Sequence, residues 1–129
     1  MQLMTGRILK EFFEAANQRD FSFIAKLYSP DALIHALDGD EYGPEAILNI
    51  FNKWMDAFPD FQFEPLATRQ EKDVVIVHWC ANGTFANQVR DMPPTGKKIT
   101  IHGFTCFKCS GNHVIEHWAR VDYRSLTNG

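Results

Sequence analysis

The sequence predicts an α+β domain in which three N-terminal helices pack against a cone-shaped, curved antiparallel sheet. Apolar residues recur at helical spacing up to Phe58, and from Phe61 onward they alternate with a period of two. The connections between the alternating segments are short, which makes neighbouring strands antiparallel. A chain of 129 residues has the size of one domain, so we expect residues 1–129 to form a single domain.

The helical part divides into three segments. Residues 7–18 place their apolar side chains on one face, as in a helix with one buried side. A shorter helix follows, with Asp20 as its N-cap and Tyr28 near its end, and Pro30 stops it. Gly43-Pro44-Glu45 then opens a third helix, with proline in its first turn and an acid near the positive end of the helix dipole.

The remaining segments predict strands. A small hairpin around the turn Asp38-Gly39 follows the second helix. Four longer strands are expected after the third helix, at about 61–70, 74–86, 97–108 and 113–122. The longer connection at 87–96 is interpreted either as a lid or as a plain hairpin loop. The strand at 74–86 is apolar on both faces, so its outer face needs cover, and a second subunit would supply it. We therefore expect a homodimer.

Composition excludes several partners. The net charge of −3 argues against nucleic acid or an anionic membrane as the partner, since both select a basic surface. No run approaches the roughly 20 apolar residues that a membrane span needs. Three cysteines and the lack of an apolar signal-like segment at Met1 indicate a reducing, cytoplasmic compartment. Phe accounts for 11 residues, against 3 Trp and 3 Tyr, which predicts a large apolar interior or pocket.

Six short segments, spread along nearly the whole chain, carry a family resemblance. They are Phe12-Phe13-Glu14-Ala15-Ala16-Asn17 with Arg19-Asp20, Tyr28-Ser29-Pro30-Asp31-Ala32, Tyr42-Gly43-Pro44-Glu45-Ala46-Ile47, Ala57-Phe58-Pro59-Asp60-Phe61, Pro93-Pro94-Thr95-Gly96-Lys97 and Glu116-His117-Trp118. Together they resemble the SnoaL-like polyketide cyclase family of the nuclear transport factor 2-like superfamily. The resemblance implies a cone-shaped α+β barrel with a deep apolar pocket between the sheet and the helices.

The last predicted strand holds the two candidate catalytic residues. Alternation places His117 on the more apolar face. There it is an acid/base for a substrate, a hydrogen-bond partner of a substrate oxygen, or a core histidine bonded to a backbone carbonyl. The family resemblance implies an aspartate on the C-terminal strands, often two residues after this histidine, where this chain has Ala119. Asp122 is the nearest substitute, although regular alternation turns it away from the pocket unless a bulge intervenes.

Five further residues are candidates for substrate binding. The resemblance places His35 at the mouth of the cone. Trp54 and Trp79 are expected to form walls of the pocket. Phe85 follows Gly83-Thr84, at a position where the family often has a histidine. His102 lies in the middle of a strand, and its side chain is expected either in the pocket or in the core.

These features favour a small-molecule enzyme: a cyclase, isomerase or lyase that moves a proton on an apolar carbonyl compound without a cofactor. Ala119 and Phe85 stand where the family often has polar groups, which favours instead a non-catalytic binding protein for a small apolar ligand. A dimeric interaction domain with a cone filled by side chains is a third interpretation. The single pair Cys106 and Cys109 is too weak a signal for zinc, and we expect no metal.

Overall fold

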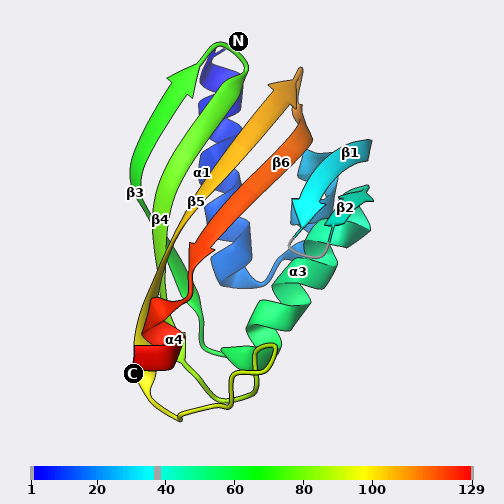
Figure 1. Ribbon diagram of the computed structural model, residues 1–129. Helices are drawn as coiled ribbons and strands as arrows, with labels where there is room; N and C mark the ends of the chain where they lie inside the picture. The colour runs from blue at the N-terminus through cyan, green and yellow to red at the C-terminus, as the bar shows by residue number, and fades with distance from the viewer. Residues whose placement is uncertain (1, 37–38, 129) are drawn as a thin grey trace.

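The computed structural model of the protein describes residues 2–36 and 39–128 (Figure 1). Its helices are α1 (Gln2–Gln18), α2 (Phe21–Leu27), α3 (Pro44–Ala57) and α4 (Arg124–Asn128). Its strands are β1 (Tyr28–Ala36), β2 (Gly39–Tyr42), β3 (Gln62–Glu71), β4 (Val74–Thr84), β5 (Lys98–Ser110) and β6 (His113–Asp122). The predicted α+β class and the order of its elements are therefore confirmed.

The six strands form one curved, open sheet in the order β2-β1-β6-β5-β4-β3 (Figure 1). Every neighbouring pair is antiparallel except β1 and β6, which run parallel. The prediction of a wholly antiparallel sheet was wrong at this pair. The short-connection rule orients strands that follow each other along the chain, and β1 and β6 are separated by most of the sequence. The predicted hairpin is the β1–β2 pair, and Asp38 of its turn lies outside the described residues.

Helices α1, α2 and α3 lie along one side of the sheet, where α1 packs on β3 and β4, and α3 packs on β1 (Figure 1). Asp20 caps α2 as predicted, and its side chain accepts a hydrogen bond from the Phe23 N–H at 3.2 Å. The helix ends one residue earlier than expected, so that Tyr28 begins β1 and is buried. The sequence prediction also missed the short helix α4, whose Leu126 is buried against the domain.

A polar contact fastens the end of α3 to the end of β4. Both oxygens of Asp60 accept hydrogen bonds from Thr84, from its N–H at 2.7 Å and from its hydroxyl at 2.8 Å. These bonds lower the pKa of Asp60. Gly83 precedes this contact, and a Cβ there would lie 2.8 Å from the Phe61 ring. The segment Ala57-Phe58-Pro59-Asp60-Phe61, which carries part of the family resemblance, is thereby held against the end of β4.

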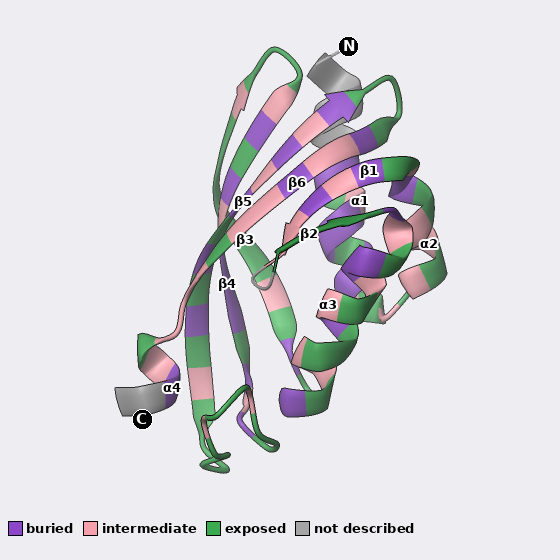
Figure 2. Ribbon diagram, turned by 45° about the vertical axis from the view of Figure 1, so that its right-hand side comes forward, coloured by how far each residue is buried: buried purple, intermediate pink, exposed green. Residues whose placement is uncertain are grey.

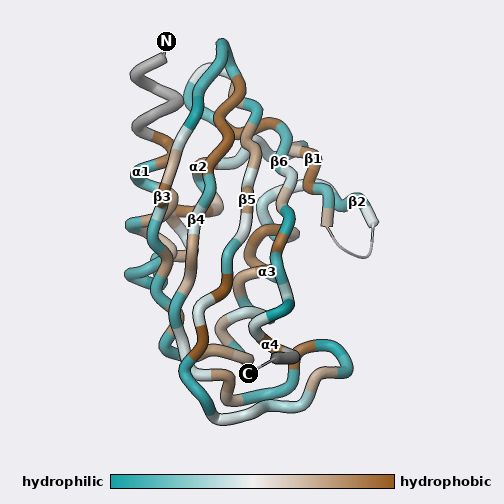
Figure 3. Tube along the Cα trace, turned by 60° about the vertical axis from the view of Figure 1, so that its left-hand side comes forward, coloured by the Kyte–Doolittle hydropathy of each residue, from teal (hydrophilic) through white to brown (hydrophobic). Residues whose placement is uncertain are grey.

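The two faces of the sheet differ in burial. On β4, inward Val75, Val77 and Trp79 are buried, whereas outward Ile76 is 44% exposed, and Phe104 on β5 is 53% exposed. Figure 2 shows this alternation of buried and exposed residues along the strands. The hydropathy view places apolar segments within otherwise polar strands (Figure 3). Within the described residues, no helix is long and apolar enough to cross a membrane.

Candidate functional site

Two adjoining cavities lie between the helices and the inner face of the sheet. The inner cavity has a volume of about 70 Å³, and the outer one about 310 Å³. Five residues line both of them: Ile50, Trp54, His117, Ala119 and Val121. These residues mark the junction, so a molecule that fills both cavities must pass His117.

The inner cavity is walled by aromatic rings, which are Phe12, Phe13, Phe51, Phe61, Phe63 and Trp79, with Trp54 at the junction. The Nε1–H of Trp79 donates to the Thr105 hydroxyl at 2.8 Å. A Cβ at Gly103 would lie 2.3 Å from Cζ2 of Trp79, so the indole lies directly against the backbone of β5. Of the described residues that line this cavity, none carries a carboxylate. Its polar groups are the Thr105 hydroxyl and the His117 imidazole.

His117 projects from β6 toward the helices and is only 6% exposed. Its Nδ1 lies 2.9 Å from the Tyr28 hydroxyl, and its ring is nearly perpendicular to that of Phe107, with ring centres 5.3 Å apart. Burial lowers the pKa of His117 from 6.5 to about 3, and the nearby charge of His35 adds to this effect. The imidazole is therefore neutral at physiological pH.

The second nitrogen of His117 faces the cavity. Tyr28 is the one hydrogen-bond partner that the described residues give to this ring. None of their fully buried polar side-chain atoms lacks a partner. Because Nδ1 is the atom bonded to Tyr28, Nε2 is not sealed within the protein, and it reaches the surface of the cavity.

Tyr28, which sequence reasoning did not select as a site residue, is the hydrogen-bond partner of His117. It is 2% exposed, and burial, together with nearby Cys109, raises its pKa well above the ordinary 10.0. Its partner His117 lies 89 residues away in the sequence. The contact arises from the parallel pairing of β1 with β6, which no local pattern indicated. The remaining signal was the Tyr-Ser-Pro-Asp segment that carries part of the resemblance.

The outer cavity is more polar than the inner one. Its wall includes Glu41 of β2, Lys53 and Asp56 of α3, and Arg90 of the 87–96 connection. Two acids and two bases thus line this cavity. Tyr123 closes one side, and its ring stacks on Trp54 with ring centres 6.0 Å apart. The predicted wall residue Trp54 thus borders both cavities.

His35 borders the outer cavity, but its imidazole lies on the face of the sheet opposite His117. Its Nε2 lies 2.7 Å from Glu116 Oε2, and its Nδ1 lies 2.9 Å from Asp40 Oδ1. The ring also stacks on Trp118 at a centre-to-centre distance of 5.0 Å. The hydrogen bond with Glu116 is the main reason that the pKa of His35 is raised.

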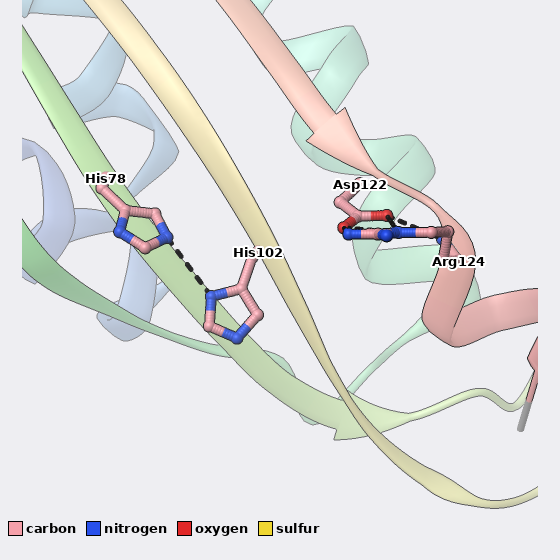
Figure 4. A network of polar contacts seen from close by, with 4 residues as sticks. All are labelled: His78, His102, Asp122 and Arg124. Carbon is pink, nitrogen blue, oxygen red and sulfur yellow. Dashed lines mark hydrogen bonds and ion pairs between the residues drawn. The ribbon is translucent and has the colours of Figure 1, made fainter.

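Three candidates, Asp122, His102 and Phe85, line neither cavity. Figure 4 shows the polar contacts that two of them, Asp122 and His102, make. Asp122 lies on the outer face, where its carboxylate accepts hydrogen bonds from Arg124 Nε at 2.9 and 3.0 Å. These bonds lower the pKa of Asp122 to about 2. His102 also points outward, and its Nδ1 lies 3.3 Å from His78 Nε2. Phe85 is fully buried and stacks on another core ring.

A curved sheet, three helices on one side and an apolar cavity with a buried histidine define a cone-shaped α+β domain. The model of the SnoaL-like polyketide cyclase family matches residues 7–128, and the chain belongs to this family. This confirms the resemblance on which the sequence analysis relied.

Solved structures share the fold over almost the whole chain. AclR from Streptomyces galilaeus is 24% identical with a TM-score of 0.87, and the match covers 99% of this chain and 96% of that one. IdmH from Streptomyces antibioticus is 22% identical with a TM-score of 0.84 and 96% coverage of both chains. TsrD from Streptomyces laurentii is 16% identical with a TM-score of 0.85, covering 98% of this chain and 96% of that one. No curated protein sequence matches this chain significantly.

Proposed function

We propose that this protein is a cofactor-free cyclase, isomerase or lyase that moves a proton on an apolar carbonyl compound. The observation that carries the proposal is the placement of His117. One nitrogen is hydrogen-bonded to Tyr28, and the other faces an apolar cavity. A group held within hydrogen-bond reach of the reacting atom in such a site is what proton-transfer catalysis requires. Membership of a family of cyclase-type enzymes supports the same reaction class.

The shape of the cavities suggests how a substrate lies. The inner cavity of about 70 Å³ accepts only part of a ring compound, and the outer cavity accepts the rest. Trp79 and Trp54 would contact the apolar rings, and the carbonyl group would lie at the junction beside His117. The proposal assigns no role in the reaction to Asp122, because Arg124 holds its carboxylate on the outer face.

The test uses α-tetralone, an apolar bicyclic ketone whose α-hydrogens exchange slowly with solvent. Proton NMR in D2O follows the loss of the α-hydrogen signal with and without protein. The proposal expects the protein to accelerate exchange and expects His117→Gln to abolish the acceleration. His113→Gln is the matched control, since His113 is exposed at the far end of the same strand. Equal acceleration by wild type and His117→Gln would overturn the role of His117.

A second candidate function is a binding protein that leaves its ligand unchanged. The observation that favours it is the wall of the inner cavity, where Ala119 and the other described lining residues supply no carboxylate. The same experiment separates the two functions. If α-tetralone raises the melting temperature but gains no deuterium beyond the background, the binding protein is the better description. The two cavities do not favour the third interpretation, an interaction domain with a filled cone.

We also propose that the protein is a homodimer that pairs through the outer face of β4 and β5. Ile76 and Phe104 are exposed on this face, and His78 stacks on Phe104 with ring centres 4.7 Å apart. Large apolar side chains that lie together on a surface are typical of interfaces. Sedimentation velocity at micromolar concentration should show a dimer, and Phe104→Glu should convert it to monomer. Thr95→Glu, in the exposed 87–96 connection, is the control. A monomeric wild type would refute the pairing.

We infer a cytoplasmic location from cysteine chemistry. Cys80, Cys106 and Cys109 are all free thiols, as expected in a reducing compartment. Burial raises the pKa of all three thiols, so they are poor nucleophiles and poor metal ligands. Fractionation of cells that express the protein with its natural sequence would test the location.

A further inference from the structure

The Tyr28–His117 hydrogen bond has two possible directions, and they give the cavity opposite chemistry. If the Tyr28 hydroxyl donates to Nδ1, the single ring proton of neutral His117 is on Nε2, and the cavity presents a donor. If instead Nδ1–H donates to the hydroxyl oxygen, Nε2 is bare, and the cavity presents an acceptor. The distance of 2.9 Å fits both directions.

The surroundings of Tyr28 distinguish the two directions. Its hydroxyl is buried, and the described residues offer it no hydrogen-bond acceptor other than the His117 ring. A donated Nδ1–H would therefore leave the hydroxyl hydrogen buried without an acceptor, which is costly. A donating Tyr28 satisfies the hydroxyl hydrogen and Nδ1 together. Both side chains are uncharged near neutral pH, because burial raises the pKa of Tyr28 and lowers that of His117.

We infer that Tyr28 is a positioning residue that donates to Nδ1 and holds His117 as the Nε2–H tautomer. The site then takes ligands through an acceptor oxygen, as in a ketone, an enolate or a phenolate. The aromatic walls of the inner cavity favour ligands in which this oxygen is attached to an apolar ring or chain. Ligands whose only polar group is a donor, such as an ammonium, are disfavoured at the junction.

The tautomer of His117 and the ligand preference do not depend on the proposed function. Only the part that His117 plays in the reaction rests on it. There, the Nε2–H of His117 donates a hydrogen bond to the carbonyl oxygen while the α-hydrogen leaves as a proton to solvent water. The Nε2 proton stays on His117 and the hydrogen bond continues to the enolate oxygen. The C–H bond breaks, its electron pair becomes the enolate, and return of a solvent proton to carbon restores the ketone. A neutral imidazole that donates in this way stabilises the developing oxyanion without itself becoming a cation.

The direct experiment measures the tautomer in the folded protein without any substrate. Long-range proton–nitrogen NMR of 15N-labelled protein distinguishes a protonated ring nitrogen from a bare one, and loss of the signal in His117→Gln assigns it. The inference expects a protonated Nε2 and a bare Nδ1 in the wild type at pH 7. A protonated Nδ1 would overturn it. In Tyr28→Phe, the donor is gone, and the inference expects the Nδ1–H form to gain population, which a merely structural role of Tyr28 would not produce.

The second experiment measures ligand preference with α-tetralone and tetralin, which share a bicyclic frame but differ in the carbonyl oxygen. The inference expects the ratio of their dissociation constants to favour α-tetralone more in wild type than in His117→Phe, by about three- to tenfold. An unchanged ratio would refute the donor role. Because the ratio is measured at equilibrium, it does not depend on turnover. A changed ratio without α-hydrogen exchange would therefore leave this inference standing while refuting the proposed enzyme.

Discussion

His117 and His35 lie one strand apart, and their environments shift the pKa in opposite directions. Ile34 is paired with His117 and His35 with Trp118, so the two imidazoles point to opposite faces of the sheet. Burial lowers the pKa of inner His117 to about 3. Outer His35 is held between two carboxylates, and its pKa is raised. The comparison teaches that the face of the sheet, rather than the residue type, decides whether a histidine here carries charge.

The same division runs along β6. Its outward residues Glu116 and Asp122 are both engaged with basic side chains, whereas inward Ala119 leaves a methyl group at the junction of the cavities. Charges are satisfied on the side that faces water, where solvation and ion pairing cost little. The inner face is left with neutral hydrogen-bonding groups in an apolar cavity. The inner cavity therefore offers a ligand neutral donors and acceptors rather than ionised side chains.

The largest expected effect concerns how stability depends on pH through His117. The pKa of this residue is lower in the folded state than in the unfolded state. Below pH 6.5, His117 is therefore protonated in the unfolded chain but stays neutral in the folded protein. Its contribution to stability is complete above that pH and is lost as the pH falls toward 3. When the pH falls from 6.5 to 4.5, the free energy of unfolding of the wild type should decrease by about 2 kcal/mol more than that of His117→Gln. Urea unfolding at the two pH values measures both decreases.

The comparison between variants removes the carboxylates from this measurement, since they titrate alike in both proteins. His113→Gln, which changes an exposed histidine of the same strand, should keep the pH dependence of the wild type. If wild type and His117→Gln lose stability in parallel, His117 is not held neutral, and the contrast with His35 disappears.

The next effect tests the packing of the inner face. Gly103→Ala places a methyl group where the Trp79 indole now lies, since a Cβ there would be 2.3 Å from the ring. The indole must move, which should destabilise the fold by about 1–3 kcal/mol and weaken α-tetralone binding. Denaturant unfolding and calorimetric titration measure the two losses. Thr100→Ala, on the same strand but exposed, should change stability by about 0.5 kcal/mol or less.

Local sequence patterns were sufficient to predict most helices and strands, whereas the candidate site depends on contacts between residues far apart in the sequence. The period of two along 113–122 placed His117 on the apolar face, as found, because alternation depends only on neighbouring residues. Tyr28 was assigned to a helix, since Leu27 and Tyr28 continue the apolar spacing of α2 up to its last turn. The register of β1 against β6 decides that Tyr28 meets His117, and the two are 89 residues apart. No sequence period carries that information.

The predicted pocket positions of His102 and Phe85 were wrong for a similar reason. His102 shares its face of β5 with Phe104, and apolar neighbours suggested an interior position. The structure has both side chains on the outer face, where Phe104 is exposed. Periodicity divides a strand into two faces but does not say which face meets the helices when both contain apolar residues. Phe85 was rightly read as apolar, but it fills the core between Phe58 and the end of β4.

A smaller effect is expected for the outer histidine. His35 has a higher pKa in the folded state than in the unfolded state, so its contribution to stability is present below the unfolded value and is lost as the pH rises through the folded one. The difference in the free energy of unfolding between wild type and His35→Gln, measured by urea unfolding, should therefore favour the wild type more at pH 5.5 than at pH 8.5. This is the opposite sign to the His117 comparison. A difference that grows toward alkaline pH would show that Glu116 and Asp40 do not hold the charged ring.

The smallest effect links the two histidines directly. The charge of His35 contributes to the lowered pKa of His117, but burial is the larger cause. In His35→Gln, the pKa of His117 should therefore rise slightly and remain well below 6.5, as followed by the imidazole carbon-bound proton signals in an NMR titration. Glu116→Gln provides the converse test, because it removes the main cause of the raised pKa of His35 and leaves that ring less charged at a given pH. If His35→Gln returned the pKa of His117 to an ordinary value, charge rather than burial would keep the inner histidine neutral, and the apolar cavity would not be its cause.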